Sequence, residues 1–309
     1  MTNGPRPTDG SLRGRITRIR KRTGLTPKAF FASIVFPIVC AIVILGVLAV
    51  APVDERMTIV WAPLVAVASG LSATAIGVYG GVLVPGLLLL GIDPRFAAAA
   101  SLFLQVLVIP LGASAHYRLG NVTRHVAVPL VIGGMAGAFI GPFFAVMLPK
   151  DVIARIVAGV IVLVGVLVLL TLRWGGLRSV IPTEQVSRPR IGGVGLVAGF
   201  ASGISGAGWG PIGVKLLILL RLEPRQAIGS SLVGRVFMAA AAVVGYVLSA
   251  TAFKDVKPDL WLIIPMLAGS VAAMVPGAFL VTKLDRERAT VAITLLSIAL
   301  ALPTLAFGH

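Results

Sequence analysis

Two cations lie inside stretches of the sequence that are otherwise largely apolar. Arg235 follows Pro224 by eleven residues, which places it near the middle of an apolar run over 226–250. A charged side chain at the centre of a bilayer is costly, and such a residue is by default a candidate for a functional site. The planar fork of a guanidinium is suited to bind oxyanions. We therefore expect Arg235 to be the main charge of an anion-binding site.

Lys215, the second cation, has two open interpretations. It stands six residues before Arg221, at the end of an apolar run. A lysine there can bind the anion, or it can extend along the apolar surface until its ammonium reaches the interface.

Neutral donors and glycines gather around two interruptions in the apolar pattern. Glycines there provide N–H groups at the starts of half-helices, whose positive dipole ends favour anions. Serine and glycine in membrane helices also serve close packing and backbone hydrogen bonds, which is the competing interpretation for each of them. The candidates for substrate binding, besides the two cations, are Ser72, Tyr79, Gly80, Gly81, Ser101, Gln105, Ser202, Ser205, Gly208, Trp209, Gly210, Ser230 and Ser231.

The composition predicts that these residues lie within a membrane. Of 309 residues 57% are hydrophobic and only 12% are charged, and the mean hydropathy is +1.01. A membrane-spanning helix needs about 20 apolar residues. Runs of that length occur near 29–50, 95–116, 125–148, 152–172, 226–250, 259–282 and 288–307. The sequence thus predicts an all-α integral membrane protein.

An arginine-rich tail over 1–28 precedes an extra transmembrane helix over 29–52. The apolar run is longer than the core of about 7–15 residues in a secretory signal peptide. Pro52 is also unfavourable directly after the candidate cleavage site at 49–51. We expect a retained helix with its basic tail in the cytoplasm, because cytoplasmic segments of membrane proteins are rich in lysine and arginine.

The remaining composition excludes several classes of function. The net charge of +16 is spread over the tail and short loops without interleaved aromatic residues, which favours contact with anionic lipid over nucleic acid. A single cysteine permits no disulfide framework or cysteine metal site. Every acidic residue falls in the tail, a loop or a helix end, so no carboxylate is placed for a proton relay or sodium site. We expect no cofactor and no metal, and passive transport driven by the anion gradient and the membrane potential.

The chain also carries an internal repeat. A shift of 130 residues aligns Pro94-Arg95 with Pro224-Arg225, and Ser101-Leu102 with Ser231-Leu232. The halves are 58–172 and 191–307, joined by a basic segment over 173–190. Under the same shift Arg235 corresponds to the neutral Gln105. The two halves are therefore not chemically equivalent, and one cationic site is expected rather than two.

Each half opens with an apolar stretch broken by glycine and proline, over 58–91 and 191–221. A continuous helix over the first would be about 50 Å long at about 1.5 Å per residue, too long for one crossing. Paired interrupted segments at matching positions of two halves indicate a transporter's binding site. We expect each half to form a broken helical hairpin followed by three transmembrane helices.

The loop cations favour an inverted arrangement of the halves. If each broken stretch enters the membrane and returns, more cations fall on the cytoplasmic side than outside. Those inside are then Arg118, Arg124, Arg173, Arg178, Arg188, Arg190, Arg221, Arg225, Lys283, Arg286 and Arg288. Those outside are Arg56, Arg95, Lys150, Arg155, Lys254 and Lys257. If each stretch crosses once, the two sides nearly balance.

The duplicated breaks, the leucine runs after them and the segments "DPRFAAAASL" and "EPRQAIGSSL" resemble the sulfite exporter TauE/SafE family over about 58–307. The resemblance implies a transporter that moves sulfite, a sulfonate or a related sulfur-containing anion across the bacterial inner membrane. Because the membrane potential pushes an anion outward, the passive transport expected above favours export. An importer of such an anion is the alternative. The chain's partners are then the small anion and the lipid bilayer, and a homodimer is left open.

Two other classes compete with a transporter. Gly203-Ile204-Ser205-Gly206 fits the Gly-x-Ser-Gly pattern around the nucleophile of intramembrane rhomboid proteases. A serine nucleophile needs a base within hydrogen-bonding reach, and no histidine lies in a later predicted helix. A structural membrane subunit is the other class, and it predicts no charge such as that of Arg235 in mid-membrane.

Overall fold

The computed structural model describes residues 27–50, 56–76, 78–118, 120–173, 182–207, 209–252, 260–281 and 286–307. These residues form helices joined by short connections, without a strand among them. The helices are α2 (Pro27–Val50), α3 (Arg56–Ile76), α4 (Gly80–Leu89), α5 (Pro94–Arg118), α6 (Arg124–Met147), α7 (Lys150–Arg173), the 3-10 helix η1 (Thr183–Gln185), α8 (Arg188–Ser205), α9 (Trp209–Leu219), α10 (Pro224–Ala252), α11 (Leu260–Val281) and α12 (Arg286–Phe307). The predicted all-α class is confirmed.

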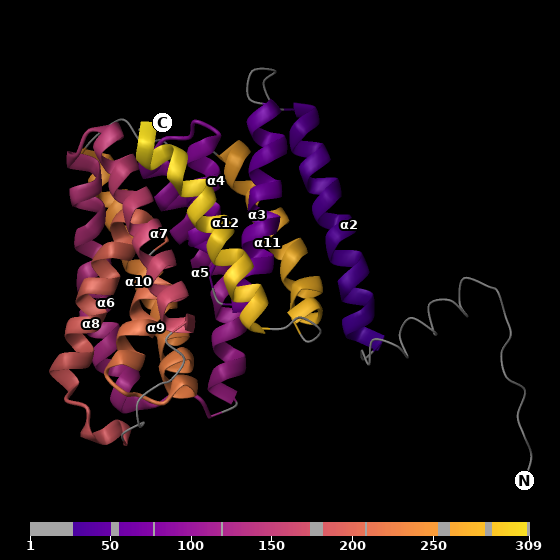
Figure 1. The fold of residues 1–309 in the computed structure, drawn as a ribbon. Helices are drawn as coiled ribbons and strands as arrows, with labels where there is room; N and C mark the ends of the chain where they lie inside the picture. The colour runs from indigo at the N-terminus through magenta and orange to yellow at the C-terminus, as the bar shows by residue number, and fades with distance from the viewer. Residues whose placement is uncertain are drawn as a thin grey trace, which may run out of the picture.

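Long apolar helices run side by side through the molecule (Figure 1). Five segments of the described chain are long and apolar enough to cross a membrane, and they lie in α3, α6, α7, α10 and α12. Large apolar side chains such as Ile132, Leu163 and Val247 are exposed on the outer surfaces of these helices. Such side chains favour a lipid environment over water. The protein is therefore a multi-pass integral membrane protein.

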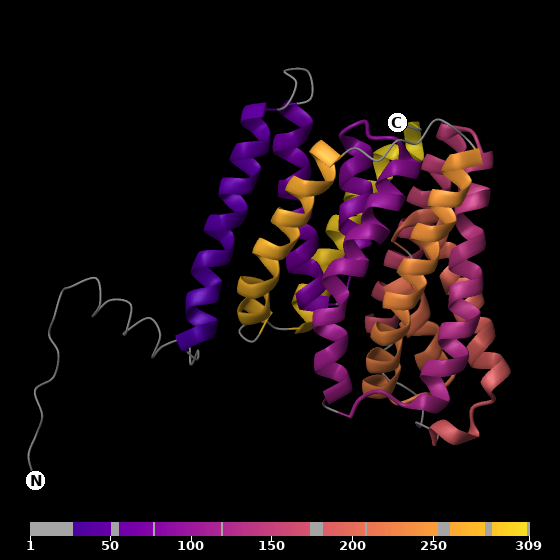
Figure 2. The same cartoon turned by 180° about the vertical axis from the view of Figure 1, so that it is seen from behind.

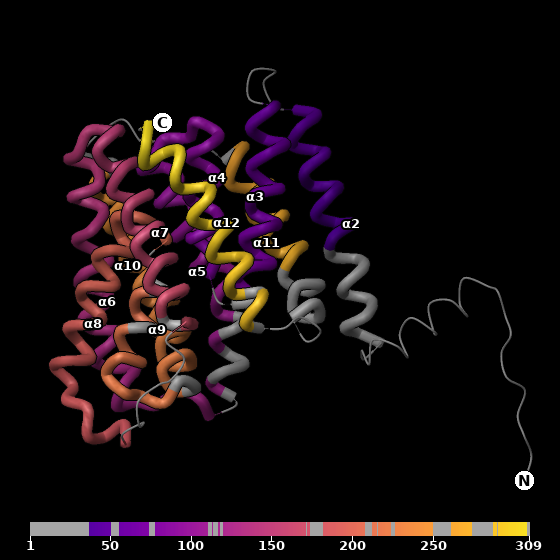
Figure 3. The backbone as a smooth tube through the Cα atoms, in the orientation of Figure 1, coloured from indigo at the N-terminus to yellow at the C-terminus, as the bar shows by residue number. Residues whose placement is uncertain are grey.

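Both predicted interruptions are present, and Figure 3 traces the helices on either side of each one. Helix α3 ends at Ile76 and α4 begins at Gly80, while α8 ends at Ser205 and α9 begins at Trp209. Gly206 ends α8 with a φ of +65°, in the left-handed region that glycine adopts without the steric cost of a side chain. Helices α3 and α4 form a hairpin whose open end is at the upper face in Figure 1, whereas the hairpin of α8 and α9 opens at the lower face.

Glycines bring the backbones of certain helices into direct contact. A Cβ atom added at Gly137 of α6 would lie 2.1 Å from the carbonyl oxygen of Leu196 in α8. A Cβ added at Gly269 of α11 would lie 2.5 Å from the carbonyl oxygen of Pro63 in α3. Small residues permit this approach between membrane helices, where packing replaces the hydrophobic effect as the source of association. Each hairpin is thus fixed by a long helix packed on its first arm.

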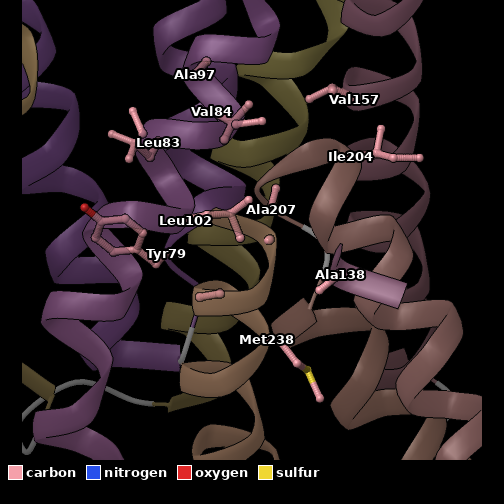
Figure 4. Close-up of a cluster of buried hydrophobic side chains, with 14 of the residues drawn as sticks. Tyr79, Leu83, Val84, Ala97, Leu102, Ala138, Val157, Ile204, Ala207 and Met238 are labelled. Carbon is pink, nitrogen blue, oxygen red and sulfur yellow. The ribbon is translucent and has the colours of Figure 1, made fainter. Parts of the chain in front are cut away.

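The two central helices, α5 and α10, pack on each other, while α4 contacts α5, α9 contacts α10, and α7 packs on α12. Helix α2 lies at one edge of the molecule, mainly against α11 (Figure 2). In the interior, Tyr79 and Leu83 of the first hairpin lie in one buried hydrophobic cluster with Ile204 and Ala207 of the second (Figure 4). The innermost parts of the two hairpins therefore share one core.

Candidate functional site

Arg235 lies on α10 and is buried in this core, with 4% of its surface exposed. Among the residues whose side chains are described, Arg235 is the only charged residue that is buried. Its Nε–H donates a hydrogen bond of 2.8 Å to Oε1 of Gln105 on α5. Tyr79, at the break of the first hairpin, is buried in the same core. The predicted mid-membrane cation is therefore an interior group that faces the other central helix.

The side-chain amide of Gln105 is held by a network of its own. Its Nε2 donates to the carbonyl oxygen of Gly206 at 2.9 Å and to Oγ of Ser101 at 3.0 Å. Ser101 Oγ in turn donates to the same carbonyl at 2.9 Å. A carbonyl oxygen accepts only, so the NH₂ group must face Gly206 and the amide oxygen must face Arg235. The chemistry of the neighbours thus fixes the amide orientation.

The start of α4 lies against this network. A Cβ atom at Gly80 would be 2.1 Å from the carbonyl oxygen of Gly206 and 2.9 Å from Oγ of Ser101. No side chain caps α4, whose N-cap residue is Tyr79. The first N–H groups of a helix have no partner within the helix, and they carry the positive end of its dipole. The breaks of the two hairpins therefore meet beside the buried arginine.

Tyr79 is fully buried and is also linked to a neighbouring helix. Its phenol oxygen lies 2.6 Å from Oγ of Ser270 on α11. Ser270 Oγ donates to the carbonyl oxygen of Met266 at 2.8 Å, so the Tyr79 hydroxyl is the donor to Ser270. This bond fixes the phenol ring on the side of the first hairpin.

Several predicted serines use their hydroxyl hydrogens within their own segments. A helical serine commonly donates to a carbonyl in the preceding turn. Ser72 bonds to the carbonyl oxygens of Ser69 and Val78, Ser205 to that of Ala201, and Ser231 to that of Ile228. For these three residues the packing interpretation accounts for the observed hydroxyl bonds.

The other predicted residues lie at different depths. Ser230 Oγ accepts from the backbone N–H of Thr123, in the connection between α5 and α6 at the lower face of Figure 1. The carbonyl of Ser202 accepts from the N–H of Gly206 at 2.7 Å and closes the last turn of α8. Gly81, in α4, faces α12, with Ser297 Oγ 3.8 Å from its added Cβ. Ser230 and Gly81 thus contact other parts of the molecule.

Four predicted residues cannot be placed in the site by their side chains. Trp209, Gly210 and Lys215 belong to α9, but their side chains lie outside the described part of the chain, as does Gly208. The two interpretations of Lys215 therefore both remain predictions.

Sequence reasoning missed two participants, Gly206 and Ser270. Gly206 has a recognisable signal, because a glycine directly after an apolar helix is typical of a left-handed C-terminal cap. Ser270 has none, since only the fold brings α11 to Tyr79.

The described side chains provide no catalytic arrangement at Ser205. Its hydroxyl donates to the Ala201 carbonyl and accepts from the Ala207 N–H. His125 instead contacts the Val186 carbonyl near the opposite end of α8.

Within the described residues, no group of three or more histidine, cysteine or acidic side chains is placed to hold a metal.

Comparison with known families decides the class. The sulfite exporter TauE/SafE family matches residues 62–303. The chain belongs to this family. The family consists of membrane transporters rather than enzymes, and the match begins after α2, within α3.

Two curated relatives from Bacillus subtilis (strain 168) agree with this assignment. The probable membrane transporter protein YtnM is 30% identical over 200 residues, which cover 64% of this chain and 65% of the relative. The probable membrane transporter protein YdhB is 28% identical over 171 residues, or 54% of this chain and 66% of the relative. The matched region thus spans just under two thirds of each relative's length. No solved structure matches the chain.

Proposed function

We propose that the protein exports sulfite or a related sulfur-containing anion across the bacterial inner membrane, and that the anion binds at Arg235. The family match and the naming of both relatives as probable membrane transporters support transport. An anionic substrate is supported by one observation: the buried guanidinium of Arg235 lies beside the point where two helix breaks meet. A guanidinium is suited to bind an oxyanion, and a charge buried in an apolar helix is by default a functional group.

The proposed site combines a charge with helix ends. Helices α4 and α9 both begin at the breaks, and the two hairpins come from opposite faces of the molecule. Their N-terminal dipole ends add to the positive potential around Arg235. The guanidinium supplies the bidentate geometry that an oxyanion accepts. Tyr79, Gly80 and the break at Gly206 then surround the anion.

We further propose that 58–172 and 191–307 are inverted repeats, joined by the loop 173–190 and preceded by the tail 1–28 and the extra helix 29–52. Arg235 and Gln105 are 130 residues apart, which is the repeat shift, and they bond to each other. Two equivalent residues in contact must lie beside the axis that relates the halves. Helix α6 packs on α8 as its equivalent α11 packs on α3, which supports the same relation. Transporters with inverted repeats bind substrate at such an interface.

The orientation follows from the cations of the two faces. Helices α6, α8 and α10 begin at the lower face in Figure 1, and the exposed Arg124, Arg188, Arg190 and Arg221 lie near these helix starts. The positive-inside rule makes this face cytoplasmic and places the N-terminus there too. The membrane potential, negative inside, then drives an anion outward. Export needs no coupled ion in this scheme.

Transport into and out of proteoliposomes tests this function. Efflux of preloaded sulfite should accelerate under an inside-negative potential, and Arg235→Gln should abolish it. Each hydrogen bond lost to a charged group costs about 1.5–3 kcal/mol, or about tenfold to a hundredfold in affinity, and glutamine replaces neither the charge nor the planar fork of donors. Arg235→Lys should restore transport only in part, because an ammonium lacks the planar fork. Arg188→Gln, at an exposed arginine, is the matched control and should transport normally.

Two results would contradict the proposal. An Arg235→Gln protein that moves sulfite at the unaltered rate would place the site elsewhere. Transport that depends on a pH gradient at zero potential would exclude passive export. A thermal-shift series with sulfite, sulfate, thiosulfate, sulfoacetate and a carboxylate identifies the preferred anion among the sulfur-containing candidates.

A further inference from the structure

The buried guanidinium of Arg235 raises the question of what compensates it between two transport events. A buried charge without hydrogen-bond partners is strongly destabilising. In the structure the Nε–H of Arg235 is bonded to the amide oxygen of Gln105, at 2.8 Å. Gln105 itself is 1% exposed, so water does not replace it readily at this position.

Gln105 is built to accept from the guanidinium rather than to bind the anion. The NH₂ group of Gln105 donates to the Gly206 carbonyl and to Ser101 Oγ. The remaining polar atom is Oε1, which repels an anion and attracts a cation. The amide cannot turn over without setting its oxygen against the Gly206 carbonyl and its NH₂ against Arg235.

On the basis of the proposed function, we propose that Gln105 is a positioning residue that substitutes for the anion when the site is empty. Its neutral oxygen occupies the Nε–H of Arg235 until an anion arrives. Hydrogen bonds between ionised groups are stronger than those to a neutral acceptor, so the anion displaces the amide. When the anion leaves, the amide oxygen returns and the empty transporter has no unpaired Nε–H.

The location of the bond supports this role. Gln105 lies on α5 and Arg235 on α10, so the bond joins the two central helices. A bond between elements that move relative to one another affects the rate of the movement. The empty transporter must make that movement in net export, whereas in exchange the transporter crosses only in its loaded form and is empty only while it faces one side.

Two assays on the full-length protein in proteoliposomes separate these steps. One measures net sulfite efflux, and the other measures exchange of internal for external labelled sulfite. Gln105→Leu should slow net efflux about tenfold, the equivalent of one lost bond to a charged group, and should leave exchange within about twofold of the original rate. A purely structural defect would lower both rates together.

Gln105→Glu tests the same idea in the opposite direction. A carboxylate at this position pairs with Arg235 and competes with the anion, so sulfite should bind at least about tenfold more weakly by thermal shift. Gln105→Asn is the control for an altered amide and reports whether the position tolerates change. If Gln105→Leu does not fold, Gln105→Met supplies the same loss of an acceptor with a more adaptable side chain.

The outcomes distinguish the inference from the function beneath it. Equal losses of efflux and exchange in Gln105→Leu, or unchanged sulfite binding in Gln105→Glu, would overturn the role of Gln105 while an inactive Arg235→Gln protein still supported the site. Full transport by Arg235→Gln would overturn the proposed site itself, and the role of Gln105 with it.

Discussion

Two pairs of helices that correspond under the repeat shift differ in how they pack. Helix α6 packs along α10, where a Cβ added at Gly245 would lie 2.6 Å from the carbonyl oxygen of Phe139. Among the residues that the structure describes, the corresponding helices α11 and α5 have far less contact. By contrast, the pairs α6 with α8 and α11 with α3 both pack closely. The halves therefore agree in how each hairpin is held. They differ in how closely α6 packs on α10 and α11 packs on α5.

This difference has a functional interpretation. If the two halves are the inverted repeats proposed above, structurally identical halves would give both faces the same access to the proposed site. A transporter avoids this by placing its two halves in different arrangements and exchanging them. We interpret the close α6–α10 contact and the open α5–α11 contact as one of two such arrangements. In the other, α5 packs on α11 and α6 separates from α10.

Locking the closed contact should have the largest effect. Met238 of α10 lies over Gly134 of α6, with its Cγ 2.9 Å from a Cβ added at that glycine. Disulfide-bonded cysteines have Cβ atoms about 3.5–4.5 Å apart, so Gly134→Cys with Met238→Cys, in a Cys40→Ala background, should cross-link readily. Sulfite efflux should then cease and should recover after reduction. Gel mobility and efflux on the same sample measure both.

The corresponding pair in the other half provides the comparison. Under the repeat shift Gly134 and Met238 correspond to Ile264 and Val108. Ile264→Cys with Val108→Cys should cross-link slowly, and only as fast as the protein visits the second arrangement. Rapid cross-linking of both pairs, or full efflux from the cross-linked first pair, would contradict two exchanging arrangements.

Exchanging the two axial residues should have the next largest effect. Because Arg235 and Gln105 correspond under the repeat shift and bond to each other, the double variant Arg235→Gln with Gln105→Arg retains one guanidinium at this contact. Its sulfite efflux should be at least about tenfold faster than that of Arg235→Gln alone, because one hydrogen bond to a charged group is worth about this factor. Recovery is measured as the initial rate of sulfite efflux.

Gln105→Arg alone is the control for the exchange, because it places two guanidinium groups side by side. Like charges at this depth repel strongly, so the single variant should be less stable than the double variant in thermal unfolding. A folded double variant as inactive as Arg235→Gln would show that the positions are not interchangeable.

Much of this architecture could be predicted because it depends on local composition. Apolar runs of membrane-spanning length predict the helices, and a stretch as long as 58–91 has to break within one bilayer. Arg235 was identifiable because a charge in an apolar run is rare. The repeat shift placed Gln105 opposite Arg235, but it did not reveal that the two residues touch. That contact depends on how α5 and α10 pack against each other in three dimensions, which local sequence does not show.

The roles of the serines could not be predicted, for a physical reason. A serine hydroxyl in any helix can reach a carbonyl of the preceding turn, and the sequence does not show whether it does. Ser205 and Ser231 donate in this way, whereas Ser101 reaches across to Gly206 in the other hairpin. The difference arises from the neighbouring helix, which is absent from local sequence.

The smallest expected effect concerns the helix pairs that both halves share. A Cβ at Gly199 of α8 would lie 2.2 Å from the carbonyl oxygen of Gly134, and one at Gly269 of α11 would lie 2.5 Å from that of Pro63. Gly199→Ala should lower stability by about 1–3 kcal/mol, typical of overpacking, and Gly269→Ala by less, because its contact is longer.

Gly193→Ala is the control on α8, since nothing lies within 4 Å of its added Cβ. It should be neutral or slightly stabilising, because alanine favours helix more than glycine does. Thermal unfolding in detergent ranks the three variants. An equal loss at Gly199 and Gly193 would show that the substitution acts on the helix itself, whereas the predicted order would show that the backbone contact between the helices sets the stability of each half.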